Sequence, residues 1–402
     1  MGVVPSMTGN MNRKSIGSRE LESLVGLALK EAKALGADQA EVAASQDTGL
    51  SVTARLGDVE NLEFTNDRGF GVTVYKDNCK GSASTSDITP TAIREAVAKA
   101  YSFAKYTTED LNSSLADAEL MATKILDLDL DHHWDIDAEQ AIALAIKCEN
   151  AAMAHDKRIC NSEGATVNTN RGIRAYGNSH GFFGSAPKTS HGISCVVLAE
   201  QDGAKQRDYH YTSSRVPNEL EEVESVGIEA GRKTIARLGA RKIKTTAAPV
   251  LYVPSLARGF IGHAMSAISG NAQYRRSSFL LDAIGKKIFS DFVQVQERPH
   301  IPQGMLSCAY DGEGVATYDR DIIIDGCLDG YILDSYSARR LGLKTTANSG
   351  GVQNLLIPGS DTNKSKLIKE MGSGLVIEEL IGQGVNGVTG DYSRGAAGHW
   401  VE

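Results

Sequence analysis

The stretch "GFGVTVYKDNCKGSASTS" (residues 69–86) decides the fold class of this chain. Its apolar and polar residues alternate, and Gly, Asp and Asn interrupt the alternation. A period of two places every second side chain on the same face, which is typical of a half-buried β-strand and not of a helix. The stretch therefore predicts antiparallel strands, and similar runs precede it within residues 40–67.

Helical patterns flank these strands. Residues 18–37 carry apolar side chains at helical spacing between a Ser and a closing Gly, and residues 89–106 have Pro in their first turn. The same order of helix, strands and helix recurs within residues 137–240. No residue-level identity accompanies this recurrence, so a structural duplication is a hypothesis from element order alone.

Two segments divide the chain into regions. Residues 107–133 are acidic and loop-like, and "KIKTTAAP" (242–249) separates the second closing helix from a strand-rich remainder that includes "YILDSYS" (331–337). Helices segregated from antiparallel strands predict the α+β class. We expect an N-terminal α+β region at 18–107, a central α+β region at 128–241, which could form one domain with the first, and a mostly β C-terminal domain at 245–402.

Charge and apolar patterning exclude several functions. The 402 residues carry a formal net charge of −8, whereas nucleic-acid binding needs a basic surface. No apolar run reaches the ~20 residues of a membrane helix, and the first eighteen residues lack the apolar core of a signal peptide. The 6 Cys form no CxxC pair, which favours free thiols in a reducing compartment. We expect a soluble, cytoplasmic protein without nucleic-acid or membrane partners.

Two stretches match functional motifs by letter, and a third is rich in acidic residues. "GNSHG" (177–181) matches a nucleophile elbow and "GQGVNG" (382–387) a dinucleotide loop, but both motifs need a following helix, and Gly-rich sequence follows instead. We interpret them as a hairpin turn and a Gly-rich loop. "DLDLDHHWDID" (127–137) is interpreted as a solvated acidic loop, with a weak cation site as the alternative, and the scattered His as surface or hydrogen-bonded core residues.

Three longer segments resemble one family. They are "GVTVYKDNCKGSASTSD" (71–87), "YDGEGVATYDRDIIIDGCLDGYILDSYSARRLGLKTTANSGG" (310–351) and "GVNGVTGDYSRGAAGHWVE" (384–402). These are similar to segments of the TldD/PmbA family, and the resemblance extends over about residues 20–402, on the PmbA (TldE) side of the family. Chains of the family typically continue for some tens of residues beyond the last segment, so the resemblance implies further strands there.

The resemblance gives particular meaning to the helix around His263. TldD-type members carry HExxxH there, in which two His bind zinc and the Glu is the general base, and a Cys near the C-terminus is the third ligand. The matching positions in this chain are Arg258, Gly259, Gly262 and His263, with Ala396 or Ala397 near the position of the Cys. A cation replaces the first ligand and Gly replaces the base. The resemblance therefore implies no catalytic residue, metal or other cofactor in this chain.

Helix geometry bears on the same motif. Residues five apart are about 500° round a regular α-helix, or about 140° away from a shared face, so they cannot both bind one ion. A local widening towards π geometry would bring them together, and Gly262 would help the backbone deform. A catalytic zinc needs three protein ligands and a water, and His263 is the one family ligand left here.

What the resemblance implies about function is a subunit of a zinc metallopeptidase. The expected partner is a TldD-type subunit that holds the zinc, in a heterodimer, with a homodimer as the other possibility, and the expected substrate is an extended, unfolded peptide. Family members are linked to the processing of peptide-antibiotic precursors, to degradation of an antitoxin and to modulation of DNA gyrase. Two alternatives stay open: a non-enzymatic regulatory protein of the gyrase-modulator type, and a homodimeric hydrolase with an unrecognised site.

Overall fold

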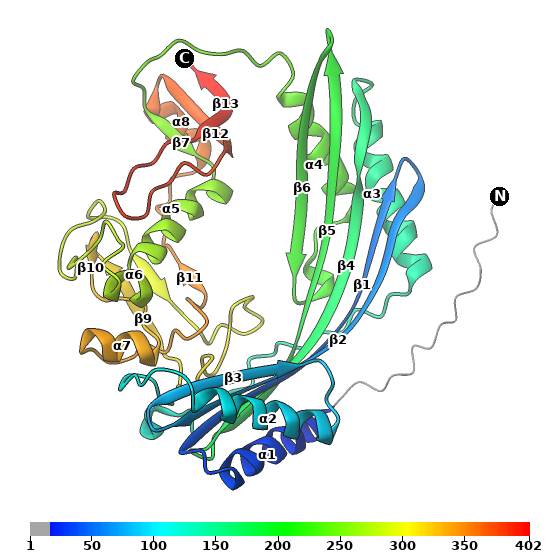
Figure 1. Ribbon diagram of the computed structural model, residues 1–402. Helices are drawn as coiled ribbons and strands as arrows, with labels where there is room; N and C mark the ends of the chain where they lie inside the picture. Colours follow the sequence, from blue (N-terminus) through cyan, green and yellow to red (C-terminus); the bar gives the residue numbers. More distant parts are fainter. Residues whose placement is uncertain (1–16) are drawn as a thin grey trace. The chain divides into compact units, whose positions relative to one another are not determined.

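The computed structural model describes residues 17–402 and has an α+β architecture (Figure 1). Its helices are α1 (Ser18–Ala34), α2 (Pro90–Ala104), α3 (Ala138–Ala154), α4 (Val223–Ala236), α5 (Pro254–Ala267), α6 (Gly270–Tyr274), α7 (Ser335–Leu341) and α8 (Lys364–Met371). Its strands are β1 (Gln39–Arg55), β2 (Asp58–Lys76), β3 (Cys79–Thr85), β4 (Ile159–Asn178), β5 (Phe183–Gln201), β6 (Ala204–Ser214), β7 (Val250–Tyr252), β8 (Val295–Glu297), β9 (Arg320–Ile324), β10 (Cys327–Leu328), β11 (Leu355–Leu356), β12 (Gly374–Ile381) and β13 (Gly395–Val401). The α+β prediction is confirmed.

A six-stranded sheet joins the two halves of the repeated element order. Its strands run β3-β2-β1-β4-β5-β6, so the helix–strands–helix series predicted twice in the sequence contributes three strands each time. Two-residue turns connect its hairpins at Leu56–Gly57, Asp77–Asn78 and Asp202–Gly203, and all six residues have positive φ. Such turns match the right-handed twist of the strands they join, which keeps these long strands paired to their ends.

The described chain packs as two compact units. The first comprises residues 17–48, 65–110 and 172–187. In its core, α1 and α2 pack on the sheet, with Leu21 and Ile93 fully buried against Val74 of β2. A Thr89 cap and Pro90 in the first turn begin α2, as the sequence predicts.

The second unit comprises residues 49–64, 111–171 and 188–402. There α3 and α4 cover one face of the sheet, and their core includes Val52, Cys148, Cys195 and Val226. The two helices approach closely because Gly227 lies against α3: a Cβ at this position would be 2.1 Å from the Cys148 carbonyl oxygen.

The strands of the C-terminal region are short and form two small sheets, ordered β10-β9-β8-β11 and β13-β12-β7. The core beside the first of these sheets contains Ile268, Ile322, Ile323 and Leu328. Within it, the carboxylate of Glu297 accepts a hydrogen bond from Arg320 Nε at 2.7 Å. The core fixes α5, the helix on which the predicted site depends, because Ile268 immediately follows that helix.

Several local predictions can be compared with these elements. "GNSHG" forms the turn between β4 and β5, and "GQGVNG" forms a loop after β12, so both interpretations are confirmed. The strand predicted at 331–337 is wrong, because only Ile332 forms an isolated bridge and α7 begins at Ser335. The Asp334 carboxylate accepts the Ser337 N–H at 2.7 Å and thereby caps α7.

Two expectations concern the membrane and the N-terminus. Within residues 17–402, no helix is both long and apolar enough to cross a membrane. The first eighteen residues are expected not to form a signal peptide. Residues 1–16 of this segment lie outside the described residues.

Candidate functional site

The short strand β7 leads directly into α5 and fixes where that helix begins. It pairs in parallel with β12, with Tyr252 opposite Ile377. The next residue, Val253, donates its N–H to the Ile377 carbonyl at 3.2 Å, and Pro254 occupies the first turn of α5. Pro is favoured at this position because its missing N–H has no partner there anyway. The start of α5 is therefore held by the β13-β12-β7 sheet.

The sides of α5 have different surroundings. Ile261, Ala264 and Met265 are buried in the C-terminal core. Gly259 and Gly262 are exposed, and a Cβ on either would meet no atom within 4 Å. Neither Gly is therefore required by packing, and α5 is a continuous α-helix through both.

Arg258 and His263 contact different neighbours. The Arg258 guanidinium donates a hydrogen bond to the Tyr211 hydroxyl of β6 at 3.3 Å. The His263 ring instead meets Tyr392 edge-on, with ring centroids 5.9 Å apart. The two side chains point in different directions, as expected for residues five apart on a regular helix.

Aromatic rings surround His263. Phe260 contacts Tyr252 edge-on at 4.6 Å and Tyr392 at 5.1 Å between centroids. Burial, and after it the nearby Tyr392, raises the pKa of Tyr252. Tyr392 could not be assigned to this site from sequence, because it follows α5 by more than a hundred residues and lies in a Gly-rich loop.

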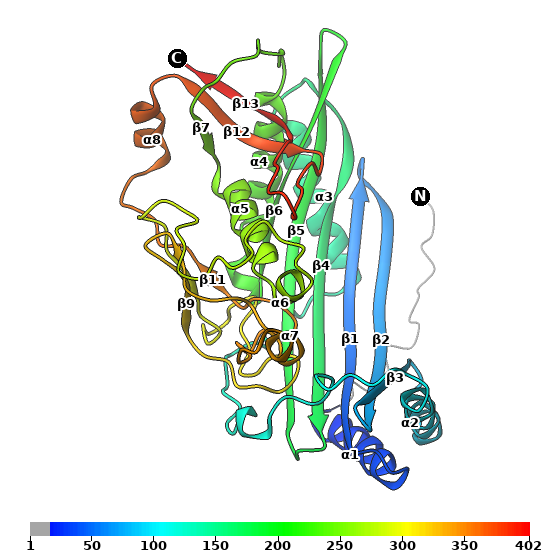
Figure 2. The same cartoon turned by 60° about the vertical axis from the view of Figure 1, so that its left-hand side comes forward.

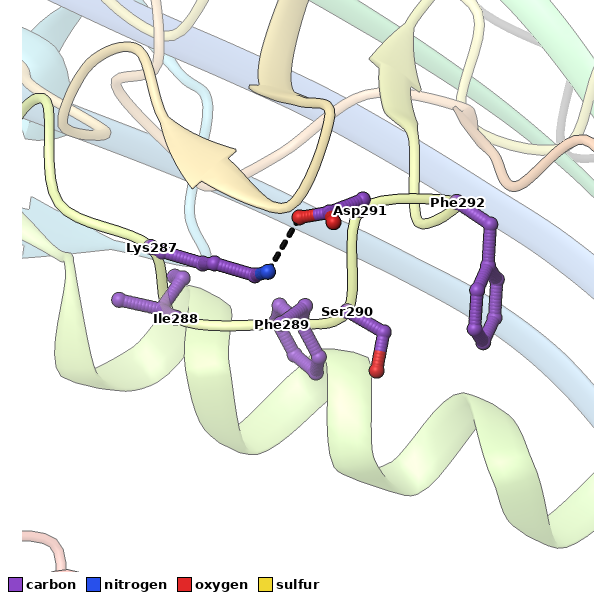
Figure 3. A pocket seen from close by; sticks show the side chains of 6 residues that line it. All are labelled: Lys287, Ile288, Phe289, Ser290, Asp291 and Phe292. Atoms are coloured by element: carbon purple, nitrogen blue, oxygen red, sulfur yellow. Dashed lines mark ion pairs between the residues drawn. The ribbon is translucent and has the colours of Figure 1, made fainter.

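A cavity of about 210 Å³ opens beside this aromatic cluster. Its lining is apolar apart from His263 and Tyr392, and consists of Phe260, His263, Ala264, Phe279, Leu280, Ile288, Phe289, Val385, Gly390 and Tyr392. A second, wider hollow of about 650 Å³ is lined by residues 287–292, where Lys287 pairs with Asp291 (Figure 3). Ile288 and Phe289 line both, so one loop separates the two hollows.

Two buried carboxyl groups, Asp311 and Glu313, lie close together in the C-terminal region. Asp311 accepts backbone N–H groups of Glu313, Val315 and Ser349 at 2.9–3.0 Å, and Glu313 accepts that of Ser335 at 3.0 Å. Burial raises the pKa of Asp311 to about 6 and that of Glu313 to about 7. Glu313 thus connects the loop 311–315 to α7, and Asp311 connects it to Ser349. Neither carboxyl group is predicted to be buried from sequence, because an acidic turn containing Gly looks solvent-exposed.

Two carboxylates of the acidic loop at 127–137 have side-chain partners outside the loop. Asp131 makes a two-point ion pair with Arg171 at 2.6–2.7 Å, which lowers the pKa of this Asp. Asp129 accepts a hydrogen bond from Gln303 Nε2 at 2.6 Å. The neighbouring His191, interpreted as a hydrogen-bonded core residue, is buried between Thr169 and the His132 carbonyl, and burial lowers its pKa.

Comparison with known proteins places these features in a family. Residues 40–104, 131–238 and 245–402 match, respectively, domain 1, the central domain and the C-terminal domain of the PmbA/TldA metallopeptidase. Metalloprotease PmbA of Escherichia coli O157:H7 is 47% identical over 382 residues, which cover 95% of this chain and 85% of that protein. The chain belongs to the PmbA/TldD family. A PmbA homolog of Haemophilus influenzae is 44% identical, over 96% of this chain and 85% of its own length.

Solved structures of the PmbA/TldD fold agree. A Bacteroides thetaiotaomicron protein described as a modulator of DNA gyrase superposes with a TM-score of 0.91 at 25% identity, over 96% of this chain and 88% of its own. TldE of Thermococcus kodakarensis superposes with a TM-score of 0.76 at 19% identity, over 90% and 83%. The second likeness concerns the fold alone.

The family description names a metallopeptidase, so the side chains around α5 can be compared with a metal site. The cavity lining offers two side chains with a lone pair for a metal, His263 and Tyr392, and α5 carries the cation Arg258 five residues before His263. Within residues 17–402, no three His, Cys, Asp or Glu side chains gather so that they could hold a metal ion. A catalytic zinc takes three protein ligands, and this lining provides fewer.

The remaining predicted positions lie on β13. Ala396 pairs with Leu380 and Ala397 with Glu379 of β12, and β12 separates them from β7. Neither Ala carries a donor atom. The structure thus places Gly259, Gly262 and His263 on one helix beside the cavity, directs Arg258 to β6, and leaves the two Ala on a different element.

Proposed function

We propose that this chain is the metal-free, PmbA/TldE-type subunit of a two-subunit peptidase, and that a TldD-type partner supplies the zinc. The observation that carries the proposal is the composition of α5. In a family of metallopeptidases, its helix has Arg258 where the first ligand would stand and Gly259 where the general base would stand. In this assignment the chain binds and positions peptide and completes the complex, while the chemical step occurs on the partner.

The proposed substrate is an extended peptide. β6 is the last strand of its sheet in the described chain, so its outer edge offers unpaired backbone groups. An extended peptide can add to such an edge through main-chain hydrogen bonds with little demand on sequence. Tyr209 and Tyr211 stack at 6.3 Å on this strand, and Arg258 of α5 reaches the second of them. A peptide along β6 would therefore pass close to α5.

Co-expression with a TldD-type subunit tests the proposal. We expect the two chains to purify together, with one zinc on the partner, and to hydrolyse unfolded peptide, whereas the isolated chain should do neither. Zinc is measured on each separated subunit by elemental analysis. Stoichiometric zinc on the isolated chain that EDTA removes, or peptide cleavage by that chain alone, would overturn the assignment.

A gyrase-modulating role is the second candidate, because two structural neighbours are described as modulators of DNA gyrase. The matching measurement is DNA supercoiling by purified gyrase with and without this chain. An effect that needs no TldD-type subunit and no peptidase activity would favour this role. The net charge of −8 makes direct DNA binding unfavourable, so such a role would act through the enzyme.

A further inference from the structure

Among the strands that the structure describes, none lies beside the outer edge of β2 between Asp58 and Phe64. The neighbours of β2 are β1 on one side and β3 on the other, but β3 pairs only with residues 70–76. Figure 2 shows β2 along the margin of the sheet, with β3 confined to its lower end. All seven residues from 58 to 64 are exposed, including Val59 (44%), Leu62 (42%) and Phe64 (54%).

The turn before β2 determines which backbone groups face outward. Leu56 and Gly57 both have positive φ, as in a two-residue hairpin turn of type I′. In such a hairpin the residues flanking the turn, Arg55 and Asp58, exchange hydrogen bonds with each other, and successive residues then alternate in direction. The N–H and C=O groups of Val59, Asn61 and Glu63 therefore point away from β1 and form the free edge.

This edge is held in place before any partner arrives. The two carboxylate oxygens of the buried Glu149, on α3, accept the N–H groups of Leu56 and Gly57 at 2.9 and 3.0 Å. Arg55 Nε donates to the Ser162 carbonyl of β4 at 2.9 Å. A pre-ordered strand loses little conformational entropy when it pairs, and this favours association.

The side chains of the edge also favour pairing. Arg55 Nη1 and Glu60 Oε1 form an ion pair at 3.2 Å, which places Glu60 on the same face as Arg55, and the period of two then puts Leu62 and Phe64 there as well. Exposed edges in natural proteins are usually protected by charged side chains, especially Lys, by Pro or by a bulge. Residues 58–64, "DVENLEF", contain no Lys or Pro, and their charged side chains are three carboxylates, which repel a second acidic strand and leave the edge open to a basic one.

Charge indicates which kind of strand fits. The edge carries Asp58, Glu60 and Glu63, and among the residues that the structure describes only Glu60 has an ion-pair partner. A second copy of this chain would bring the same three carboxylates and a further net charge of −8. Like charges on paired strands are destabilising, whereas Lys or Arg on the incoming strand would be stabilising.

We propose that residues 58–64 of β2 form an intermolecular sheet with a Lys- or Arg-bearing edge strand of the TldD-type partner. This assignment rests on the proposed function, since that function names the partner. It goes further in locating the interface on a specific strand. Val59, Leu62 and Phe64 then become covered on association, and Asp58 and Glu63 gain cationic partners.

The sharpest test is a Pro at an outward-facing position. The Asn61→Pro variant removes an N–H that points away from β1, so the hairpin keeps its own hydrogen bonds. Asn61→Ala is the matched control. We expect Asn61→Pro to weaken binding to a purified TldD-type subunit by about tenfold or more, and Asn61→Ala by less than about threefold. Circular dichroism and thermal melts of the isolated variants establish that both fold.

Two further measurements address the backbone and the charge. Amide hydrogen exchange of the wild-type complex should show protection at Val59, Asn61 and Glu63 that the isolated chain lacks. The double variant Asp58→Lys and Glu63→Lys should weaken the complex, and the wild-type affinity should fall as salt rises.

The possible outcomes separate the two proposals. If wild type and Asn61→Pro bind the TldD-type subunit equally well, the proposed function stands and the edge assignment is overturned. If the wild-type chain does not bind that subunit, the proposed function is overturned. The assignment of a TldD-type strand to the edge of β2 is then overturned as well. Self-association of the isolated chain that Asn61→Pro abolishes would show that the edge pairs with a second copy, contrary to the charge argument.

Discussion

Buried carboxylates of this chain differ in how their charge is compensated. Glu297 is 1% exposed and accepts hydrogen bonds from the Arg320 guanidinium, the Asn348 amide and the Gln353 N–H. Glu313 has one backbone donor, and no Lys or Arg contributes to its pKa, which burial raises to about 7. Glu297 therefore has a cationic partner at hydrogen-bond distance, whereas Glu313 accepts a backbone N–H, although both are Glu in the same region of the fold.

Removing the carboxylate of Glu297 should lower the free energy of unfolding substantially. In a Glu297→Ala variant the half-buried Arg320 loses its counter-charge and Asn348 loses an acceptor, so we expect the free energy of unfolding to fall by about 3–5 kcal/mol. Glu200→Ala is the control, since it removes an exposed pair with Lys205 at 3.6 Å and should cost less than about 1 kcal/mol. Chemical denaturation of both variants measures the difference. Equal losses of unfolding free energy in the two variants would contradict the distinction between a buried ion pair and an exposed one.

The second group makes stability depend on pH. The pKa of Glu313 is about 7 in the folded chain against an ordinary 4.5, so between these values the folded state binds more protons than the unfolded state. The contribution of Glu313 to stability is therefore greatest below its ordinary pKa and is lost as pH rises through the folded pKa, by up to about 3 kcal/mol. Asp311, whose pKa is about 6, acts in the same direction.

The Glu313→Gln variant should reduce this dependence. We expect the wild-type chain to lose more unfolding free energy than the variant between pH 5 and pH 8, with the two curves diverging above pH 5. The measurement is denaturant unfolding at several pH values. Parallel curves would mean that Glu313 is not the group responsible.

At the scale of single elements, two helices use Gly for different reasons. In α4, Gly227 allows a close approach to α3, because a Cβ would lie 2.1 Å from the Cys148 carbonyl oxygen. In α5, a Cβ on Gly262 would meet nothing within 4 Å. The first Gly is required by packing, whereas the second lowers helix stability without a packing benefit.

The matched substitutions to Ala should therefore have opposite effects. Gly227→Ala should push α4 away from α3 and destabilise the chain by about 1–3 kcal/mol or more. Gly262→Ala should stabilise it by about 0.5–1 kcal/mol, through the higher helix propensity of Ala. Thermal unfolding of the two variants beside wild type measures both. A destabilising Gly262→Ala would indicate that α5 departs from a regular helix.

These elements also show how far the sequence predicts the structure. Alternation in residues 69–86 correctly predicts strands, because a sheet with one covered face imposes a period of two. The helix α7 was missed: "SYSARRL" follows an apolar run, and its start depends on the Asp334 cap. The sequence identifies the positions that match the zinc motif, but it does not predict the cavity beside His263. Its lining comes from segments distant along the chain, which only tertiary packing brings together.

At the scale of the molecule, the family fold is kept at low sequence identity. A TM-score of 0.91 at 25% identity shows that this architecture tolerates extensive substitution. On α5, an aromatic cluster of Phe260, His263 and Tyr392 lies beside an apolar cavity, and Arg258 instead contacts Tyr211 of β6. The fold therefore sets the position of α5, whereas the exposed residues of this helix can differ with function.

Two single substitutions on α5 test how regular this helix is. Each creates a second imidazole near His263. Gly259→His places it four residues before His263, about 400° round the helix and so about 40° from the same face, whereas Arg258→His places it five before, about 140° away. Because Gly259 is exposed with open space around it, the new side chain is tolerated.

We expect the Gly259→His variant to bind Zn²⁺ more tightly than both the wild-type chain and the Arg258→His variant, since only its two imidazoles can reach one ion. Competition with a chromophoric chelator measures the three affinities. Arg258→His also removes a positive charge, so Arg258→Gln serves as the control for charge alone. If Arg258→His binds Zn²⁺ as tightly as Gly259→His, α5 must widen towards π geometry when metal arrives. The obstacle to a metal in this chain would then be the missing ligands and not the helix.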